Sequence, residues 1–170
     1  MAEILGAAAT ITTTTNIWGA KWTKLVKTAM AAPLAGMTTK RTRELFHDDR
    51  CRAVATELAV ETIRVGIALK YNMEPIVQDL TTEELIAAPD ALLGKGQAAL
   101  VPGKEAPNFI SQDIAKGRRT EIDYINGLVC RKGEKAGIPT PMNQRAVEII
   151  HRIERNELRP DPANVGLMDA

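Results

Sequence analysis

The segment over residues 50–69 constrains the fold more than any other part of this sequence. Asp48 and Asp49 precede it and are favourable residues for the start of a helix. Apolar and small residues then recur at helical spacing in one stripe, which comprises Cys51, Val54, Ala55, Leu58, Thr62, Val65 and Leu69. A second face is also apolar, through Ala53, Val60, Ile63 and Ile67. A helix that is apolar on two sides must be covered on both, so we expect it at the centre of the fold.

Helical signals recur through the rest of the chain. Apolar positions repeat at helical spacing over residues 18–32, and Pro33 is expected to end or kink that helix. Further helix starts and ends are marked by capping-box spacing at 81–84 and 120–123, by Gly137, and by Thr140 followed by Pro141. The sequence therefore predicts an all-α protein, a helical bundle of about five to seven helices.

The two ends of the chain differ from its helical centre. Residues 10–15 are a β-branched run suited to a strand, but no other segment could pair with it. We therefore expect residues 1–16 to be the end of an upstream domain and its linker. Residues 17–157 are expected to form the helical domain, and residues 158–170, with two prolines, a frayed C-terminal tail.

Charge and residue spacing argue against several classes of function. The 22 basic and 21 acidic side chains give a net charge of +1, so there is no electrostatic reason to expect nucleic acid. No apolar run approaches the roughly 20 residues that a membrane helix needs, and we expect a cytoplasmic protein. Neither the two cysteines, expected to be reduced, nor His47 and His151 have the spacing of a metal site. Nucleotide-binding and hydrolase signatures such as GxGxxG and GxSxG are also missing.

Two motifs give the sequence a family resemblance. The first is Trp22-Thr23-Lys24-Leu25, and the second is TEIDYING at 120–127 followed by GIPTPMN at 137–143. In this order and spacing they resemble the C-terminal domain of the ketopantoate reductase (2-dehydropantoate 2-reductase) family over about residues 16–156. The resemblance implies the helical substrate and dimerisation domain of a homodimeric enzyme that reduces a 2-oxoacid. It also implies that a preceding Rossmann domain, of which residues 1–16 would be the end, holds NADPH.

The resemblance assigns roles to two residues. Lys24 would be the general acid that protonates the keto oxygen, and Glu121 would line the same cleft beside the cofactor. Hydride transfer to a carbonyl carbon leaves an alkoxide, which a nearby ammonium both stabilises and protonates. From the residues alone, Lys24 is also one of three lysines on a solvated helix face, and Glu121 suits the first turn of a helix.

Four positions depart from the family pattern where substrate is held. Thr28 and Ala32, four and eight residues after Lys24, stand where the family typically has asparagines. Thr42 stands at another asparagine position, and Phe109 replaces a serine. We expect a pocket so altered to hold an apolar group better than the polar tail of a hydroxy acid. The resemblance therefore supports the reaction type more strongly than it supports ketopantoate as the substrate.

Two other functions stay open on the sequence. One is a non-catalytic helical dimerisation or binding module derived from the same family. The central helix and the small residues Gly127, Gly133 and Gly137 would suit close helix packing in either case. The other is a dehydrogenase of the same broad superfamily that acts on opines or hydroxy acids, which would not be expected to contain TEIDYING. A strand followed by GxGxxG, in frame upstream, would favour the enzyme.

Overall fold

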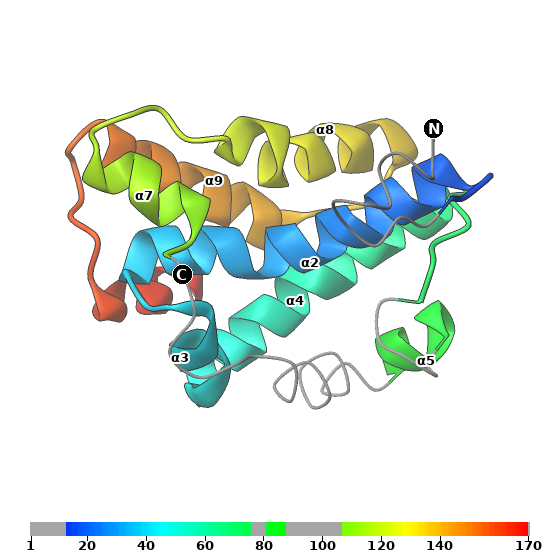
Figure 1. The fold of residues 1–170 in the computed structure, drawn as a ribbon, viewed down its shortest axis with the longest axis horizontal. Helices are drawn as coiled ribbons and strands as arrows, with labels where there is room; N and C mark the ends of the chain where they lie inside the picture. Colours follow the sequence, from blue (N-terminus) through cyan, green and yellow to red (C-terminus); the bar gives the residue numbers. More distant parts are fainter. Residues whose placement is uncertain (1–12, 76–80, 88–106, 170) are drawn as a thin grey trace, which may run out of the picture.

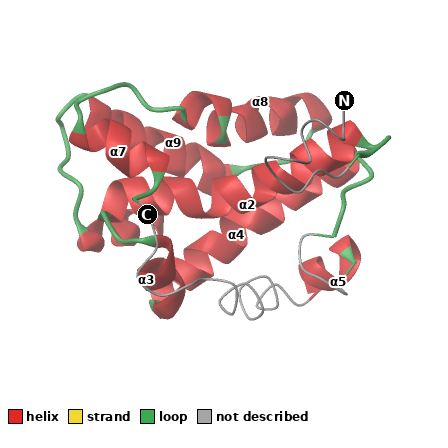
Figure 2. Cartoon of the chain, in the orientation of Figure 1, coloured by secondary structure: helices red, strands yellow, loops and turns green. Residues whose placement is uncertain are grey.

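Every regular element in the described part of the chain is helical. The computed structural model describes residues 13–75, 81–87 and 107–169, and Figures 1 and 2 show helices joined by loops. The elements are α2 (Ile17–Thr38), α3 (Thr42–His47), α4 (Asp49–Ala68), α5 (Thr82–Ala87), α7 (Phe109–Ala115), η2 (Ile122–Tyr124), α8 (Asn126–Ala136), α9 (Pro141–Glu154) and η3 (Pro162–Asp169). The predicted all-α bundle is confirmed. Of the strand expected over residues 10–15, residues 10–12 lie outside the described residues, and residues 13–15 belong to no strand.

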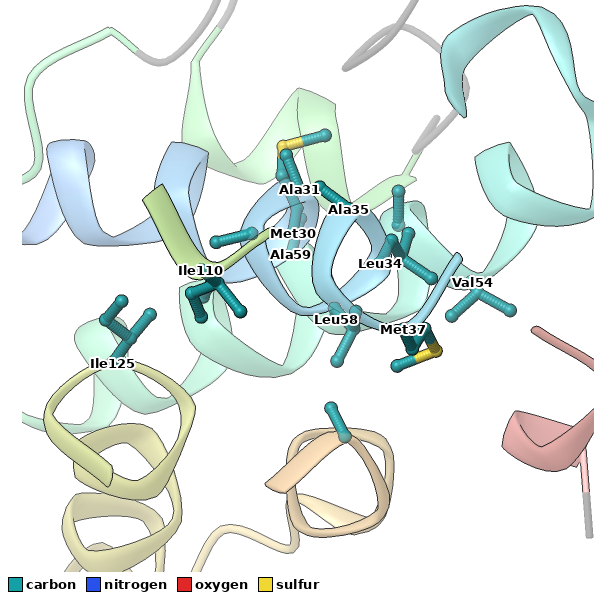
Figure 3. Packing of buried hydrophobic residues seen from close by; sticks show 14 of the residues in the cluster. Met30, Ala31, Leu34, Ala35, Met37, Val54, Leu58, Ala59, Ile110 and Ile125 are labelled. Atoms are coloured by element: carbon teal, nitrogen blue, oxygen red, sulfur yellow. The ribbon is translucent and has the colours of Figure 1, made fainter. Parts of the chain in front are cut away.

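The core lies where α2 packs against α4, with α7, α9 and η3 also in contact with α2. Figure 3 shows Leu34 of α2, Leu58 of α4 and Ile110 of α7 among the side chains of this core, and all three are fully buried. Near the other end of α2, Trp22 lies over Gly66 of α4, where an added Cβ would come within 2.3 Å of the indole nitrogen. That Nε1 donates to the Thr62 carbonyl at 3.0 Å. The two long helices therefore form the frame on which the others rest.

The position of α4 agrees with its sequence pattern, with one refinement. Asp48 caps the helix by accepting a hydrogen bond from the backbone N–H of Cys51 at 3.0 Å. On the second apolar face, Val60 and Ile63 are buried, whereas Ala53 and Ile67 are exposed. The helix is thus central, but it is covered on both sides only in its middle turns.

Pro33 was expected to end or kink α2, and the first of these alternatives is wrong, because the helix continues past it. A proline has no N–H, so it cannot donate to the carbonyl four residues earlier, which here belongs to Ala29. The side-chain amide of Asn126, at the start of α8, donates to that carbonyl instead, at 3.0 Å. Because this distant donor satisfies the carbonyl, the helix continues for five residues beyond Pro33 to Thr38.

The start of α9 is capped by a residue that the sequence did not indicate. Pro141 opens the helix as predicted, but the Thr140 side chain makes no capping hydrogen bond. The Glu61 carboxylate, from the middle of α4, accepts from the backbone N–H groups of Met142 at 2.9 Å and Asn143 at 3.0 Å. A negative charge at a helix N-terminus is favourable, so this contact ties α4 to α9.

Of the two predicted capping boxes, one forms as expected. Thr81 and Glu84 exchange side-chain to backbone hydrogen bonds of 2.8 and 3.2 Å at the start of α5. At the second box, the Thr120 N–H donates to Glu154 of α9 at 2.7 Å. Only the short η2 follows, and the backbone of Ile125 leaves the helical region before α8 begins. The prediction of one continuous helix from residue 120 is therefore wrong.

The C-terminal segment is ordered, so the expectation of a frayed tail is wrong. Met37, near the end of α2, has a carbonyl that accepts from the backbone N–H of Asp161 at 2.9 Å and from the side chain of Asn164 at 3.1 Å. Val165 and Met168 of η3 are buried against the core. The prolines at 160 and 162 end the α-helical pattern, but the residues that follow them still pack against the core.

Candidate active site

The candidate site is built on one row of α2. Lys24, Thr28 and Ala32 are spaced four residues apart, so they lie on successive turns along the same face of the helix. The structure leaves Lys24 exposed, half-buries Thr28 and fully buries Ala32. Burial therefore increases along the row from Lys24 to Ala32, and only Lys24 and Thr28 are accessible to solvent.

Thr28 is bonded to the helix that carries it. Its hydroxyl donates to the carbonyl of Lys24 at 3.0 Å. Threonine in a helix often makes this bond to the preceding turn, and the hydroxyl proton is then engaged. What remains for a ligand is the acceptor capacity of the oxygen, so Thr28 cannot donate to a substrate as an asparagine amide would.

The Lys24 ammonium has no ion-pair partner among the described residues, although two other lysines lie nearby on the exposed surface of α2. One of them, Lys21, lies 5.2 Å from the ring centroid of the exposed Trp18, a cation–π distance. Lys24 has no such contact, so its charge is available to an anionic group that approaches this face.

The remaining predicted site residues come from three other segments. Thr42 is the first residue of α3 and is half-buried, and Phe109 is the first residue of α7 with 37% of its surface exposed. Glu121 lies exposed just before η2. Within the described ranges, none of the three is hydrogen-bonded to Lys24 or Thr28, so the structure groups the residues on α2 and does not join the other three to them.

Asp123, two residues after Glu121, has a structural role. Its carboxylate is 2.8 Å from Arg119 and 3.0 Å from His151. The hydrogen bond from Arg119 lowers the pKa of Asp123, and His151 contributes in the same direction. Within the TEIDYING motif, the first carboxylate has no hydrogen bond or ion pair to a described residue, while the second joins η2 to α9.

A buried polar chain runs from α4 to α2, and sequence reasoning missed it. The Glu61 carboxylate accepts from the side chain of Asn143 at 2.7 Å, and Asn143 accepts from the side chain of Asn126 at 2.9 Å. Asn126 also holds the Ala29 carbonyl, while its own Oδ1 is buried without a partner. The two asparagines belong to TEIDYING and GIPTPMN, the two parts of the second motif, so the spacing of those parts corresponds to a contact. The one signal for Glu61 was a carboxylate within an otherwise apolar stretch of the central helix.

The two cysteines, both among the described residues, give no second catalytic candidate. Burial raises the pKa of the Cys51 thiol to about 11, which leaves it a poor nucleophile at neutral pH. Burial also raises the pKa of Cys130. In the ranges that the structure describes, no cluster of three His, Cys, Asp or Glu side chains could hold a metal ion, and no helix is both long and apolar enough to cross a membrane.

Comparison with known proteins identifies relatives of the chain. The 2-dehydropantoate 2-reductase of Archaeoglobus fulgidus is 23% identical over 133 residues, which are 78% of this chain and 40% of that protein. The PanE/ApbA family ketopantoate reductase of Ralstonia eutropha JMP134 has a solved structure with a TM-score of 0.68 and 24% identity, covering 92% of this chain and 47% of that one. D-mandelate dehydrogenase, solved with NADH and anilino(oxo)acetate, gives a TM-score of 0.70 at 24% identity, covering 91% of this chain and 59% of that one.

These relatives are oxidoreductases, and the chain spans less than half the length of the curated relatives it matches. The family model described as "Ketopantoate reductase PanE/ApbA C terminal" matches residues 16–154, which include both sequence motifs and the row on α2. The chain belongs to the family of ketopantoate reductase C-terminal domains.

Proposed function

We propose that this chain is the substrate-binding, proton-donating half of an NADPH-dependent 2-oxoacid reductase. The observation that carries the proposal is the exposed ammonium of Lys24, which has no ion-pair partner in the described part of the chain and stands at the position of the family motif. A nicotinamide cofactor, bound mainly outside this chain, would supply the hydride. Glu121 is the acidic residue of this chain proposed to assist substrate and cofactor binding.

Lys24 would act on the oxygen of the substrate carbonyl. As hydride adds to the carbonyl carbon, the C–O π electrons move to oxygen and form an alkoxide. An ammonium within hydrogen-bond distance stabilises this charge and transfers a proton to the oxygen, which completes the 2-hydroxyacid. The absence of an ion-pair partner among the described residues suits this role, because the charge is not already neutralised by a carboxylate.

For the substrate, we propose a 2-oxoacid with a bulky apolar or aryl group. The Thr28 proton is engaged by the backbone, Ala32 is fully buried and has no polar side-chain atom, and the ring of Phe109 is partly exposed. These groups offer little to a hydroxylated tail. D-mandelate dehydrogenase, which shares the fold, was solved with anilino(oxo)acetate, an aryl oxoacid.

The test is Lys24→Met in the protein encoded by the complete natural reading frame that contains this chain. On the best 2-oxoacid of a panel, kcat should fall roughly 10²–10⁴-fold, the range for loss of a positioned general acid. The melting temperature should hardly change, because an exposed lysine contributes little to folding and methionine is a good helix former. Lys27→Met, one turn away, is the matched control and should keep parental turnover with either NADPH or NADH.

A Lys24→Met variant with near-parental kcat would remove Lys24 from the mechanism. Absence of reductase activity in the parent on every oxoacid tested would instead favour the non-catalytic module. The homodimer stays a prediction, which light scattering of the same protein would check.

A further inference from the structure

We propose that Asn126 is a positioning residue that holds the reactive face of α2 in place by substituting for the backbone donor that Pro33 lacks. The inference rests on the proposed function for its catalytic part and on the structure alone for its mechanical part. Asn126 is not proposed to touch the substrate. It acts on α2 between the turns that carry Lys24 and Thr28 and the turns that enter the core.

The Ala29 carbonyl needs a donor at this point. In an uninterrupted helix it would accept from the N–H of residue 33, which proline does not have. Ala29 and Asn126 are both 0% exposed, so bulk water cannot reach the carbonyl. The side-chain amide of Asn126, 97 residues away in sequence, donates to it at 3.0 Å. A buried carbonyl without a hydrogen-bond donor lowers the stability of the fold, so α2 needs this bond in order to continue through Pro33.

Asn126 is itself held in orientation. Its amide nitrogen also donates to Oδ1 of Asn143 at 2.9 Å, so the nitrogen, not the oxygen, faces α2. Asn143 is fixed in turn by its donation to the Glu61 carboxylate at 2.7 Å. A charged acceptor at the far end fixes which way each amide points, because a carboxylate can only accept. The donor to Ala29 is therefore pre-oriented by three elements, α4, α9 and α8.

The consequence concerns the half of α2 before Pro33. Prolines within helices cause bends because the ring displaces the carbonyl four residues earlier. Here that carbonyl lies one residue after Thr28 and five after Lys24. The Asn126 bond therefore sets the direction of the segment that carries both side chains. If Lys24 must lie within hydrogen-bond distance of the substrate oxygen, a change in that direction lowers the rate without removing any reacting group.

The mechanical part is tested by a double-mutant cycle in the chain itself. Asn126→Ala should lower the folding equilibrium constant about tenfold or more, since it leaves the Ala29 carbonyl buried and unpaired. Pro33→Ala restores a backbone N–H for the same carbonyl. The factor by which Asn126→Ala lowers the folding equilibrium constant should then be about tenfold smaller in the Pro33→Ala background. All other costs of the substitution are the same in the two backgrounds and cancel. Equal losses in the two backgrounds would overturn the inference.

The matched control is Asn164→Ala. Asn164 is also a buried asparagine whose side chain donates to a carbonyl of α2, that of Met37, at 3.1 Å. That carbonyl lies near the end of the helix and does not depend on Pro33. Asn164→Ala should lower stability equally in both backgrounds. If Asn126→Ala does not fold, Asn126→Ser, which keeps a small hydrogen-bonding side chain, takes its place in the same cycle.

The catalytic part is tested by kinetics in the protein from the complete reading frame, below the melting range of each variant. Asn126→Ala should lower kcat roughly 10–100-fold, with a smaller change in KM, and Pro33→Ala added to it should restore most of kcat. Asn164→Ala should leave kcat unchanged. A lowered kcat that Pro33→Ala does not rescue, or an unchanged kcat, would overturn the positioning role. Lys24→Met is assayed in parallel, since its retention of activity would overturn the proposed function instead.

Discussion

Asn143 makes two hydrogen bonds to the same carboxylate, one from its backbone N–H and one from its side-chain amide, both to Oε2 of Glu61. Glu61 is 8% exposed and has no basic partner among the residues that the structure describes, where its hydrogen bonds all come from N–H donors. The N-terminus of α9 therefore provides the compensation that a cation would usually provide for a buried carboxylate. This arrangement explains how a charge is tolerated within an otherwise apolar helix.

The first prediction is that Glu61→Gln destabilises the fold. The amide keeps the shape of the side chain, but its NH2 group would face at least one of the donors that the carboxylate now accepts. An unsatisfied buried donor costs about 1–3 kcal/mol, so the free energy of unfolding in urea should fall by about that amount. Glu57→Gln, on the exposed side of α4, is the control and should change it by less than about 0.5 kcal/mol. Equal stabilities of the two variants would refute this account of Glu61.

The second prediction concerns acid stability. The ion pair with Lys40, followed by the N–H of Cys51, lowers the pKa of Asp48 to about 2, from 3.8 in the unfolded chain. Because the folded pKa is the lower one, Asp48 stabilises the fold above about pH 4, and this contribution is lost as the pH falls toward about 2. Asp48→Asn keeps a good helix cap but removes the charge.

Its unfolding free energy should therefore be about 1 kcal/mol lower at neutral pH and should vary less between pH 4 and pH 2 than that of the parent. Urea titrations at a series of pH values check this. Asp49→Asn is the control, because it removes a charge from the neighbouring, exposed side chain without touching the contact between Asp48 and Lys40. An Asp48→Asn profile parallel to that of the parent would mean that another group causes the acid loss.

The third prediction is that Gly133→Ala destabilises the contact between α8 and its surroundings. An added Cβ would lie 2.7 Å from the carbonyl oxygen of Ile138 and 2.8 Å from Cγ2 of Thr140. The backbone oxygen of Ile138 can move only if its whole loop moves. We therefore expect the free energy of unfolding to fall by about 1–3 kcal/mol, despite the higher helix propensity of alanine. In the same helix, the nearest atom to a Cβ added at Gly127 is the end of the Arg131 side chain at 3.3 Å, and the others lie at 3.6 Å or more, so Gly127→Ala should be neutral or stabilising. Thermal melting distinguishes the two, and a lower midpoint for Gly127→Ala would reverse the assignment.

The fourth prediction concerns substrate choice. In the protein from the complete reading frame, the ratio of kcat/KM for phenylglyoxylate to that for ketopantoate should exceed one. Phe109→Ser, which restores the family residue, should shift this ratio toward ketopantoate by roughly tenfold, in keeping with the effect of small changes in an apolar pocket. Phe46→Ser, a half-buried phenylalanine in α3, controls for loss of an aromatic ring elsewhere. A parent that prefers ketopantoate would show that these departures do not set specificity.

Signals that act within a few residues were reliable guides to the fold. Asp48 caps α4, Thr81 and Glu84 form their box, and Gly137 ends α8 in the left-handed region with φ of +70°. Each of these depends on a side chain or a backbone conformation next to the helix end. Lys24 and Thr28 were likewise placed on one face, because helical period alone fixes that relation.

The errors share a different cause, which is replacement of a local hydrogen bond by a side chain from far along the chain. Asn126 satisfies the carbonyl that Pro33 leaves open, Glu61 caps α9 in place of Thr140, and Asn164 fastens the C-terminal segment. Sequence spacing gives no measure of such contacts. For the same reason, the sequence could name Thr42, Phe109 and Glu121 as candidates but could not place them relative to Lys24.

The packing of Trp22 against Gly66 has a consequence for spectroscopy. Of the two tryptophans, Trp22 is 5% exposed with its Nε1 bonded to the Thr62 carbonyl, whereas Trp18 is 65% exposed. Unfolding therefore changes the polarity around Trp22 far more than around Trp18, and the red shift of the emission belongs almost entirely to Trp22. In a Trp18→Phe variant, intrinsic fluorescence would become a single-site reporter of the contact between α2 and α4.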